Sequence, residues 1–338
     1  MSFRKSTNAA RMERSARLNV YRDLLTFGVS YLDDAMMGIF KNDLVLIGAR
    51  SGAGKTQFCV NVAVANMKKG KRVHFIALEA EEYEIERRIK YQMFSTLFFE
   101  NRKNWSSQRR FENDLDLRTK IDEKYSGQIS YQQFVSGVYS ERNADIEDII
   151  DEKYENEYDG LFTFYKTDSF DVNDLVLQVA SIASETDLVI VDHVHYFDYD
   201  DKDENNSIKL IAKTARSLAL ENGIPIILVS HLRKADRYGD LIPSLEEFHG
   251  SSDLYKVATK AITLAPGLFD SGGKMQTFFR IVKNRNEGSV TRYSCAINYI
   301  PSEGKYETKY KIGNASQDRE SGFKEIDRIA LPWWAAVS

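Results

Sequence analysis

The sequence is short of the residues that mark several classes of protein. Its 338 residues include only 2 cysteines and 5 prolines. Two cysteines cannot form a disulfide framework, which excludes the small secreted scaffolds that depend on one. No apolar run approaches the roughly 18 residues that a membrane-spanning helix needs. These absences predict a protein without a membrane segment, in a reducing compartment such as the cytoplasm.

An excess of positive charge is also missing. The chain has 46 Lys and Arg against 50 Asp and Glu, a net charge of -4. This balance argues against a protein that coats nucleic acid non-specifically, although a local basic channel would not appear in the sum. Hydrophobic residues make up 43% of the chain, which is enough to bury a core. We therefore expect one large globular domain, with any contact to nucleic acid confined to a local surface.

Short apolar runs alternate with helical patterns, and this order predicts an α/β fold with a mainly parallel central sheet. Strands are expected at residues 44–47, 73–78, 161–165, 188–191, 226–229 and near 261–264. Helices are expected at residues 55–69, from about 81 to beyond 93, and at 172–184 and 208–222. Alternating segments at 277–283 and 291–298 predict an antiparallel hairpin at the edge of the sheet.

Composition divides the chain into a core and flanking segments. Residues 1–26 are predicted to form a basic N-terminal arm or linker helix, and residues 27–310 the α/β domain. A charged and aromatic stretch at about residues 100–160 predicts a helical insertion in that domain. Residues 311–338 form a C-terminal tail, whose Trp333 and Trp334 are expected to pack on the domain or a neighbouring subunit. Docking of a partner on these tryptophans is the alternative.

The strongest functional signal is a glycine-rich run between the first strand and the first helix. Its small residues let the backbone fold around phosphate oxygens, and the helix N-terminus offers unpaired N–H groups. Lys55 would neutralise a terminal phosphate, and Thr56 would bind Mg²⁺. The run therefore predicts a phosphate loop for ATP. The expected nucleotide-binding residues are Ala49, Arg50, Ser51, Gly52, Ala53, Gly54, Lys55, Thr56 and Gln57.

Two acids at strand ends are candidates for the chemistry of hydrolysis. Glu79 follows the second strand, beside the phosphate loop in this topology, and is predicted to polarise the attacking water. Asp192 follows the fourth strand and is predicted to hold Mg²⁺ together with Thr56. The alternative for each acid is a solvated carboxylate at a strand end, without a catalytic role.

Three histidines lie close to these strand ends in the sequence. His193 and His195 follow Asp192, and His231 ends the next strand. His195 and His231 are predicted to sense the γ-phosphate through a hydrogen bond, which places His195 among the candidate catalytic residues. A zinc site is the less favoured alternative, since it needs three or four converging ligands and Mg-ATP already explains the neighbouring acid.

With these residues in place, the chain resembles the C-terminal ATPase domain of DnaB-type replicative helicases and the helicase half of phage primase-helicases. The resemblance spans about residues 27–300 and predicts a RecA-like P-loop NTPase core. Several ordered motifs are more specific than any single one. Beside the phosphate loop, they are Phe27-Gly28, Leu32-Asp33, Leu78-Glu79, Val191-Asp192-His193, Ser230-His231-Leu232-Arg233, Gly250-Ser251 and Lys283-Asn284-Arg285-Asn286.

The resemblance implies an ATP-dependent DNA helicase of replication that forms a ring, usually a hexamer, around single-stranded DNA. In the family, a Lys-x-Arg hairpin reaches the γ-phosphate bound by the neighbouring subunit, so Lys283 and Arg285 are predicted to act there. Primase and a helicase loader are candidate partners, and a bacterial or phage-infected cell is the expected setting. The candidate contacts to DNA are Arg233, Lys234, Arg237 and Lys256.

The sequence departs from the family at the loop that contacts DNA. Residues 248–252 read Phe-His-Gly-Ser-Ser, whereas the family usually has an arginine and a second glycine there. One alternative function is therefore a RecA-like DNA-dependent or regulatory ATPase that unwinds nothing. Another alternative is a largely structural oligomer in which ATP only stabilises the subunit interfaces. The presence of Glu79, Asp192 and Arg285 argues against this alternative.

Overall fold

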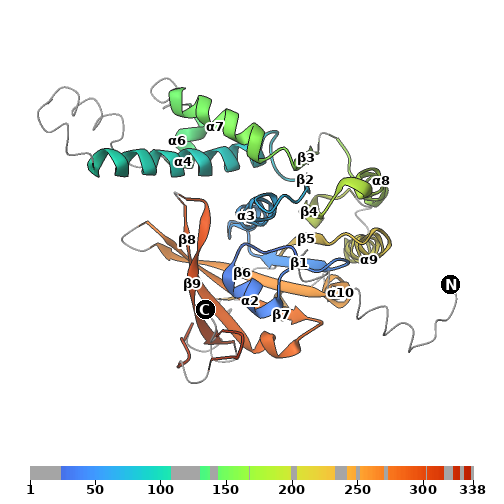
Figure 1. The fold of residues 1–338 in the computed structure, drawn as a ribbon. Coiled ribbons are helices and arrows are strands. Elements are labelled where there is room, and N and C mark those ends of the chain that lie inside the picture. The colour runs from blue at the N-terminus through green and yellow to red at the C-terminus, as the bar shows by residue number, and fades with distance from the viewer. Residues whose placement is uncertain are drawn as a thin grey trace, which may run out of the picture.

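The computed structural model describes residues 24–107, 130–137, 144–166, 168–198, 204–232, 242–248, 252–269, 273–301, 303–315, 323–327 and 331–335. Within these ranges the chain forms a nine-stranded mixed sheet with helices packed on both faces (Figure 1). The predicted α/β class is confirmed, as is the mainly parallel sheet with an antiparallel edge.

Six parallel strands make up the larger part of the sheet. In spatial order they are β3 (Leu161–Tyr165), β2 (Val73–Ala77), β4 (Leu188–Asp192), β5 (Ile226–His231), β1 (Leu44–Ala49) and β6 (Lys260–Phe269). The ends of neighbouring strands are in register, since Ala77 pairs with Asp192 and Ala49 pairs with His231. Residues that follow these strands therefore meet at one edge of the sheet, where ligands bind in open α/β folds.

Three antiparallel strands extend the sheet beyond β6. They are β7 (Met275–Asn284), β8 (Tyr293–Ile300) and β9 (Lys305–Asn314). The predicted hairpin corresponds to β7 and β8. Strand β9 was not predicted, although buried Tyr306 and Ile312 lie on one face of it with Tyr310. The predicted start of the tail at residue 311 falls inside this strand.

Each face of the parallel strands is covered by its own helical layer. Helix α3 (Lys55–Met67) packs against Val45 and Ile47, whereas α8 (Val172–Ile182) and α9 (Glu204–Asn222) pack against Leu44 and Leu46. Alternate residues of β1 thus serve two separate cores, as expected for a strand buried on both faces. The predicted apolar stripe of α9 is buried, namely Ile208, Ile211, Ala212, Ala215, Leu218 and Ala219.

The insertion is helical where it is described. Helix α4 (Glu84–Ser107) starts three residues later than predicted, because Tyr83 has a left-handed backbone (φ 64°), and it continues far into the insertion. Helices α6 (Tyr131–Val135) and α7 (Ala144–Glu157) pack on α4 (Figure 1). Residues 108–129 and 138–143 lie outside the described residues. A small separate core joins α4 to α7, made by Phe94, Phe98, Ile146 and Ile150.

Short elements complete the described chain. Helix α2 (Ser30–Met36) precedes β1, and α10 (Ser252–Val257) precedes β6. Single 3₁₀ turns occupy Ala183–Glu185, Val194–Tyr196, Leu245–Phe248 and Gly288–Arg292. Among the described helices, none combines the length and apolar character that a bilayer crossing requires.

The tail returns to the domain through one of its two tryptophans. Trp334 is buried and makes edge contacts with Tyr31 and Tyr293, with ring centroids 5.8 and 5.9 Å apart. Trp333 is 74% exposed. The expected packing is therefore confirmed for Trp334 and not for Trp333. Residues 1–23 of the predicted basic arm lie outside the described residues.

Candidate nucleotide-binding site

The phosphate loop connects the end of β1 to the start of α3. Ala49 and Ala53 are buried, and Gly52 and Gly54 have left-handed backbones with φ of 73° and 89°. Residues other than glycine rarely adopt this conformation, so the glycines allow the turn. A cavity of about 540 Å³ opens above the loop. It is lined by Ser51, Gly52, Gly54, Lys55, Thr56, Gln57, Glu79, Ala80, Glu81, Glu84, Arg88 and His231.

Two basic residues of the loop point in different directions. The Lys55 ammonium lies 3.1 Å from Nδ1 of His231 and 3.4 Å from the Arg50 carbonyl oxygen. Burial lowers the pKa of Lys55, and the carboxylate of Asp192 opposes this shift. Arg50 instead pairs with Glu247 at 2.8 Å and does not line the cavity. Of the two side chains, only Lys55 is available to a ligand in the cavity.

Thr56 and Asp192 form a ready pair of oxygen ligands. The Thr56 hydroxyl donates to Oδ2 of Asp192 at 2.6 Å. The other carboxylate oxygen, Oδ1, is buried and has no hydrogen-bond partner within the described part of the chain. Burial of such an oxygen costs free energy unless a ligand binds to it. Burial raises the pKa of Asp192 to about 6, against the hydrogen bond from Thr56. A hydroxyl and a carboxylate beside a phosphate loop suit the oxygen preference of Mg²⁺.

Glu79 is held at the rim of the cavity by two hydrogen-bonding groups. Its Oε2 lies 2.9 Å from Nε2 of His193, and the Tyr196 hydroxyl donates to Oε1 at 3.4 Å. The Glu79 side chain keeps 44% of its surface exposed. It is therefore both oriented and open to water, as a general base must be.

His193 connects Glu79 to His231, a role that the sequence did not predict. Its Nε2 lies 2.7 Å from Nε2 of His231, and its Nδ1 accepts from the His195 backbone N–H. Burial lowers the pKa of His193 to about 2, so the ring is neutral. A neutral ring that accepts at Nδ1 carries its proton on Nε2, where it can donate to Glu79 or to His231. The position of His193 directly after Asp192 was the feature of the sequence that could have indicated this role.

The structure places His231, and not His195, at the cavity. The His195 ring lies 3.3 Å from the Ser230 hydroxyl and 3.4 Å from Glu204, and it is not among the lining residues. Burial lowers the pKa of His231 to about 4. Ligand atoms of Glu79, His193 and His231 all lie within 4.8 Å of one another. The Lys55 ammonium beside His231 disfavours a second cation there.

Arg88 is a further cationic group that the sequence analysis missed. It enters the cavity from α4, where it pairs with Glu84 at 2.7 Å and lies 3.4 Å from Gln57. Its signal was weak, because arginine on the solvated face of a charged helix is common. Helix α4 follows β2 in the chain, and its position beside the phosphate loop brings Arg88 to the cavity.

The fold and this site can now be compared with known proteins. Residues 25–105 match the family model of the DnaB-like helicase C terminal domain. A solved structure of an ATPase domain superposes with a TM-score of 0.63 at 17% identity, covering 91% of this chain and 100% of that one. A DnaB-like replicative helicase, solved in a study of its interactions with primase, superposes with a TM-score of 0.58 at 18% identity. The match covers 83% of this chain and 61% of that one.

The chain is similar to DnaB-like helicase ATPase domains. The solved structures show the fold of helicase ATPase domains, and the likeness implies nucleotide binding. A "Probable plasmid replicative DNA helicase" of Chlamydia psittaci is 25% identical over 293 residues, which are 85% of this chain and 56% of the relative. A protein of the same name from Chlamydia trachomatis serovar L2 is 22% identical over 303 residues, which are 88% of this chain and 58% of the relative. The chain thus spans a little over half the length of these relatives.

The predicted Lys-x-Arg pair lies far from the phosphate loop of its own chain. The Arg285 N–H donates to the Thr259 carbonyl, and the Thr259 N–H donates to the Leu44 carbonyl, both at 2.9 Å. Arg285 therefore lies at the start of β1, whereas the loop follows its end at Ala49. Six strand residues separate the two edges by about 16 Å. Lys283 and exposed Arg285 belong to the edge opposite the nucleotide cavity.

The candidate DNA contacts are not gathered at one described place. Lys256 lies on α10, where its carbonyl accepts from Lys283 at 3.0 Å, on the same edge as Arg285. The N–H of Leu232 instead donates to Ala49 at 3.0 Å, beside the phosphate loop. The residues that follow Leu232 include three of the candidates and lie outside the described ranges, namely Arg233, Lys234 and Arg237.

Proposed function

We propose that the chain is the ATPase motor of a DnaB-like replicative helicase, an enzyme that uses ATP to move along single-stranded DNA. The observation that carries the proposal is the unpartnered Asp192 oxygen beside Thr56, in one cavity with Lys55 and Glu79. A cavity that only bound nucleotide for structural purposes would not need a water-exposed, oriented acid. The names of the relatives support the same activity.

In this proposal each residue of the cavity has a separate role. Backbone N–H groups of residues 49–57 and the Lys55 ammonium bind the phosphates of ATP. Thr56 and Asp192 hold Mg²⁺, which neutralises charge on those phosphates. Glu79 accepts a proton from the attacking water, while His193 fixes its position. His231, already 3.1 Å from the Lys55 ammonium, contacts the γ-phosphate.

Oligomerisation belongs to the same proposal. Arg285 and Lys283 cannot reach the nucleotide of their own chain across about 16 Å of sheet. A head-to-tail ring, of six subunits by resemblance, brings this edge against the cavity of the next subunit. We further propose residues 1–26 as the arm and an ATPase domain that starts at residue 27, carries its insertion at 100–160 and ends with β9 at Asn314, not at the predicted residue 310. The remaining residues are the tail. Primase and a loader are the candidate protein partners.

The first test concerns the phosphate loop. We expect Lys55→Ala to weaken ATP binding by about 100-fold, because a charge-assisted contact to phosphate is lost from a buried position. Isothermal titration with a slowly hydrolysed ATP analogue measures the change. Lys69→Ala, at an exposed lysine just beyond the other end of α3, is the matched control and should bind normally. Equal affinity in the two variants would contradict the assignment.

A second test uses the pKa of Asp192. The carboxyl is ionised above about pH 6 and protonated below it, so Mg²⁺ must displace a proton at low pH. The Mg²⁺-dependent gain in ATP affinity should therefore fall by up to tenfold per pH unit below pH 6. Because ATP phosphates also titrate in this range, Asp192→Asn gives the background profile. Identical profiles in the two proteins would exclude Asp192 as the titrating ligand.

A third test addresses DNA. ATP turnover should rise with single-stranded DNA, and a forked duplex should be unwound; stimulation without unwinding would favour the RecA-like alternative. Charge reversal of Arg233, Lys234 and Arg237 should weaken DNA binding and lower the salt slope by about 2, at ~0.7 per phosphate contact on single strands. Reversal of three exposed lysines, Lys69, Lys213 and Lys309, is the control. An unaltered slope in the first variant would move the DNA contact elsewhere.

A further inference from the structure

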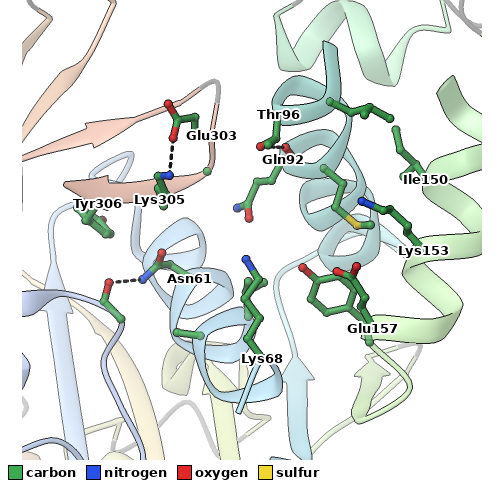
Figure 2. Close-up of a pocket in the computed structure, with 17 residues that line it drawn as sticks. Asn61, Lys68, Gln92, Thr96, Ile150, Lys153, Glu157, Glu303, Lys305 and Tyr306 are labelled. Atoms are coloured by element: carbon green, nitrogen blue, oxygen red, sulfur yellow. Dashed lines mark hydrogen bonds and ion pairs between the residues drawn. The ribbon is translucent and has the colours of Figure 1, made fainter. Parts of the chain in front are cut away.

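A second cavity lies away from the phosphate loop, between the core and the insertion. Its volume is about 400 Å³, within the range of small-molecule sites. Figure 2 shows that its walls come from α3, α4, α7 and the turn between β8 and β9. The apolar part of the wall includes Val64, Met93, Leu97 and Ile150. None of the residues assigned to the nucleotide site lines it.

Gln92 of α4 is a buried polar group that faces this cavity without a partner. Only 7% of its surface is exposed, and its side-chain Nε2 makes no hydrogen bond with any residue that the structure describes. A buried amide without a hydrogen-bond partner is costly, so such a group often marks the site of a ligand or a water. Gly304 holds the β8–β9 turn against it, since a Cβ there would come within 2.0 Å of Gln92 Cγ.

Cationic groups surround the unpartnered amide. Figure 2 shows Lys68 pointing toward Gln92 across the gap between α3 and α4, and Lys153 pointing in from α7. Neither lysine forms an ion pair with any residue that the structure describes. In contrast, Lys305 is already neutralised by Glu303 at 2.6 Å. Two free ammonium groups thus face one acid, Glu157, in the same cavity.

We infer that this cavity binds a small organic anion, with a phosphate or carboxylate group held by Lys68, Lys153 and Gln92 and an apolar body against Met93 and Leu97. Two ammonium groups and an amide N–H are donors without acceptors, which is the donor set that an anionic oxygen cluster satisfies. The apolar wall gives the site a reason to prefer an organic anion over a free inorganic ion.

We expect an anion bound in this cavity to change the affinity of the nucleotide site for ATP, a consequence that rests on the proposed function. Arg88 lines the nucleotide cavity and Gln92 lies one helical turn further along the same face of α4. Helix α3 likewise starts at Lys55, and Lys68 directly follows its last residue. An anion that draws these helices together changes the position of Arg88. The bound anion and ATP must then change each other's affinity by the same factor.

The test uses fluorinated probes in the full-length Lys55→Ala variant, so that the phosphate loop does not hold them. We expect 4-fluorophenyl phosphate or 4-fluorobenzoate to bind with a dissociation constant of about 1 mM or tighter, as measured by ¹⁹F line broadening. The neutral 4-fluorobenzamide should bind at least about tenfold more weakly. No saturable binding of either anion, or equal binding of the neutral probe, overturns the assignment.

Variants locate the site. Lys68→Gln and Gln92→Met should each weaken anion binding by about tenfold, the loss expected for one charge-assisted or buried hydrogen bond. Lys69→Gln changes the neighbouring exposed lysine, which does not line the cavity, and should bind as before. Lys68 is itself exposed, so its variant tests the proposal even if Gln92→Met disturbs folding. Equal affinity in Lys68→Gln and Lys69→Gln overturns it.

A final measurement separates this proposal from the proposed function. In the unaltered protein, saturating anion should change the dissociation constant of ATP several-fold, and ATP should change that of the anion equally. Anion binding to the Lys55→Ala variant does not require any ATPase activity. If the protein binds the anion but hydrolyses no ATP, the result supports the anion site in this cavity and excludes the proposed motor function. An unchanged ATP affinity removes the coupling.

Discussion

Glu79→Gln is expected to slow ATP hydrolysis by about 10²- to 10⁴-fold, the range for loss of a general base, while leaving ATP affinity within a few-fold. The amide is nearly isosteric, so it can keep its contacts with His193 and Tyr196. It cannot accept a proton from water. Single-turnover hydrolysis measures the chemical step, and titration of an ATP analogue measures binding.

Glu81→Gln is the matched control for this loss. Glu81 is an exposed acid that lines the same cavity, and its carboxylate pairs with Arg87 at 3.3 Å. It lacks the contact with His193 that orients Glu79. Its variant should hydrolyse ATP within a few-fold of the original rate. If Glu79→Gln also retained that rate, the base would have to lie elsewhere.

Arg285→Ala is expected to lower the turnover of the assembled protein by about 10³-fold, with ATP binding intact. An arginine directed at the transferring phosphate stabilises charge that develops only in the transition state. Arg285 is exposed at the edge of the sheet opposite the nucleotide cavity. In the proposed ring the residue therefore acts on the ATP of a neighbouring subunit, which a mixing experiment tests.

Mixed assemblies of Arg285→Ala and Glu79→Gln subunits should recover measurable hydrolysis. Some interfaces in the mixture join an intact Glu79 from one subunit to an intact Arg285 from the other. Each variant alone should stay inactive, and subunit exchange is verified by native mass spectrometry. Arg292→Ala, at an exposed arginine that follows Arg285 in the chain, is the control. Exchange without any recovered single-turnover activity would contradict action between subunits.

The sequence predicted the parallel half of the sheet well, for a physical reason. Strands buried on both faces appear in the sequence as continuous apolar runs, and glycine or proline marks the ends of the helices between them. The α9 stripe was predicted residue by residue, since its period matches one buried helix face. Strand β9 was missed because lysines and a glutamate alternate with its tyrosines, a pattern that also suits a polar tail.

The candidate site was predictable only as far as local motifs extend. The phosphate loop, Glu79 and Asp192 stand at strand ends, and a parallel sheet brings such ends together. The hydrogen bond from His193 to Glu79 depends on side-chain geometry between strands, which no spacing encodes. Arg88 likewise reaches the cavity through tertiary packing. The sequence predicted both His195 and His231 as contacts to the γ-phosphate, and of the two only His231 lines the cavity. Spacing along the chain does not show which way each side chain turns.

In the proposed ring, the opposed positions of Lys55 and Arg285 give each chain two unlike halves of an active site. An open arc of n subunits then contains n − 1 complete sites, with one cavity and one arginine left unused at its ends. Closing the ring completes the last site without any new subunit. Hydrolysis per chain should thus report how the subunits are joined, so that an assembly opening to admit a strand would also reduce its own consumption of ATP.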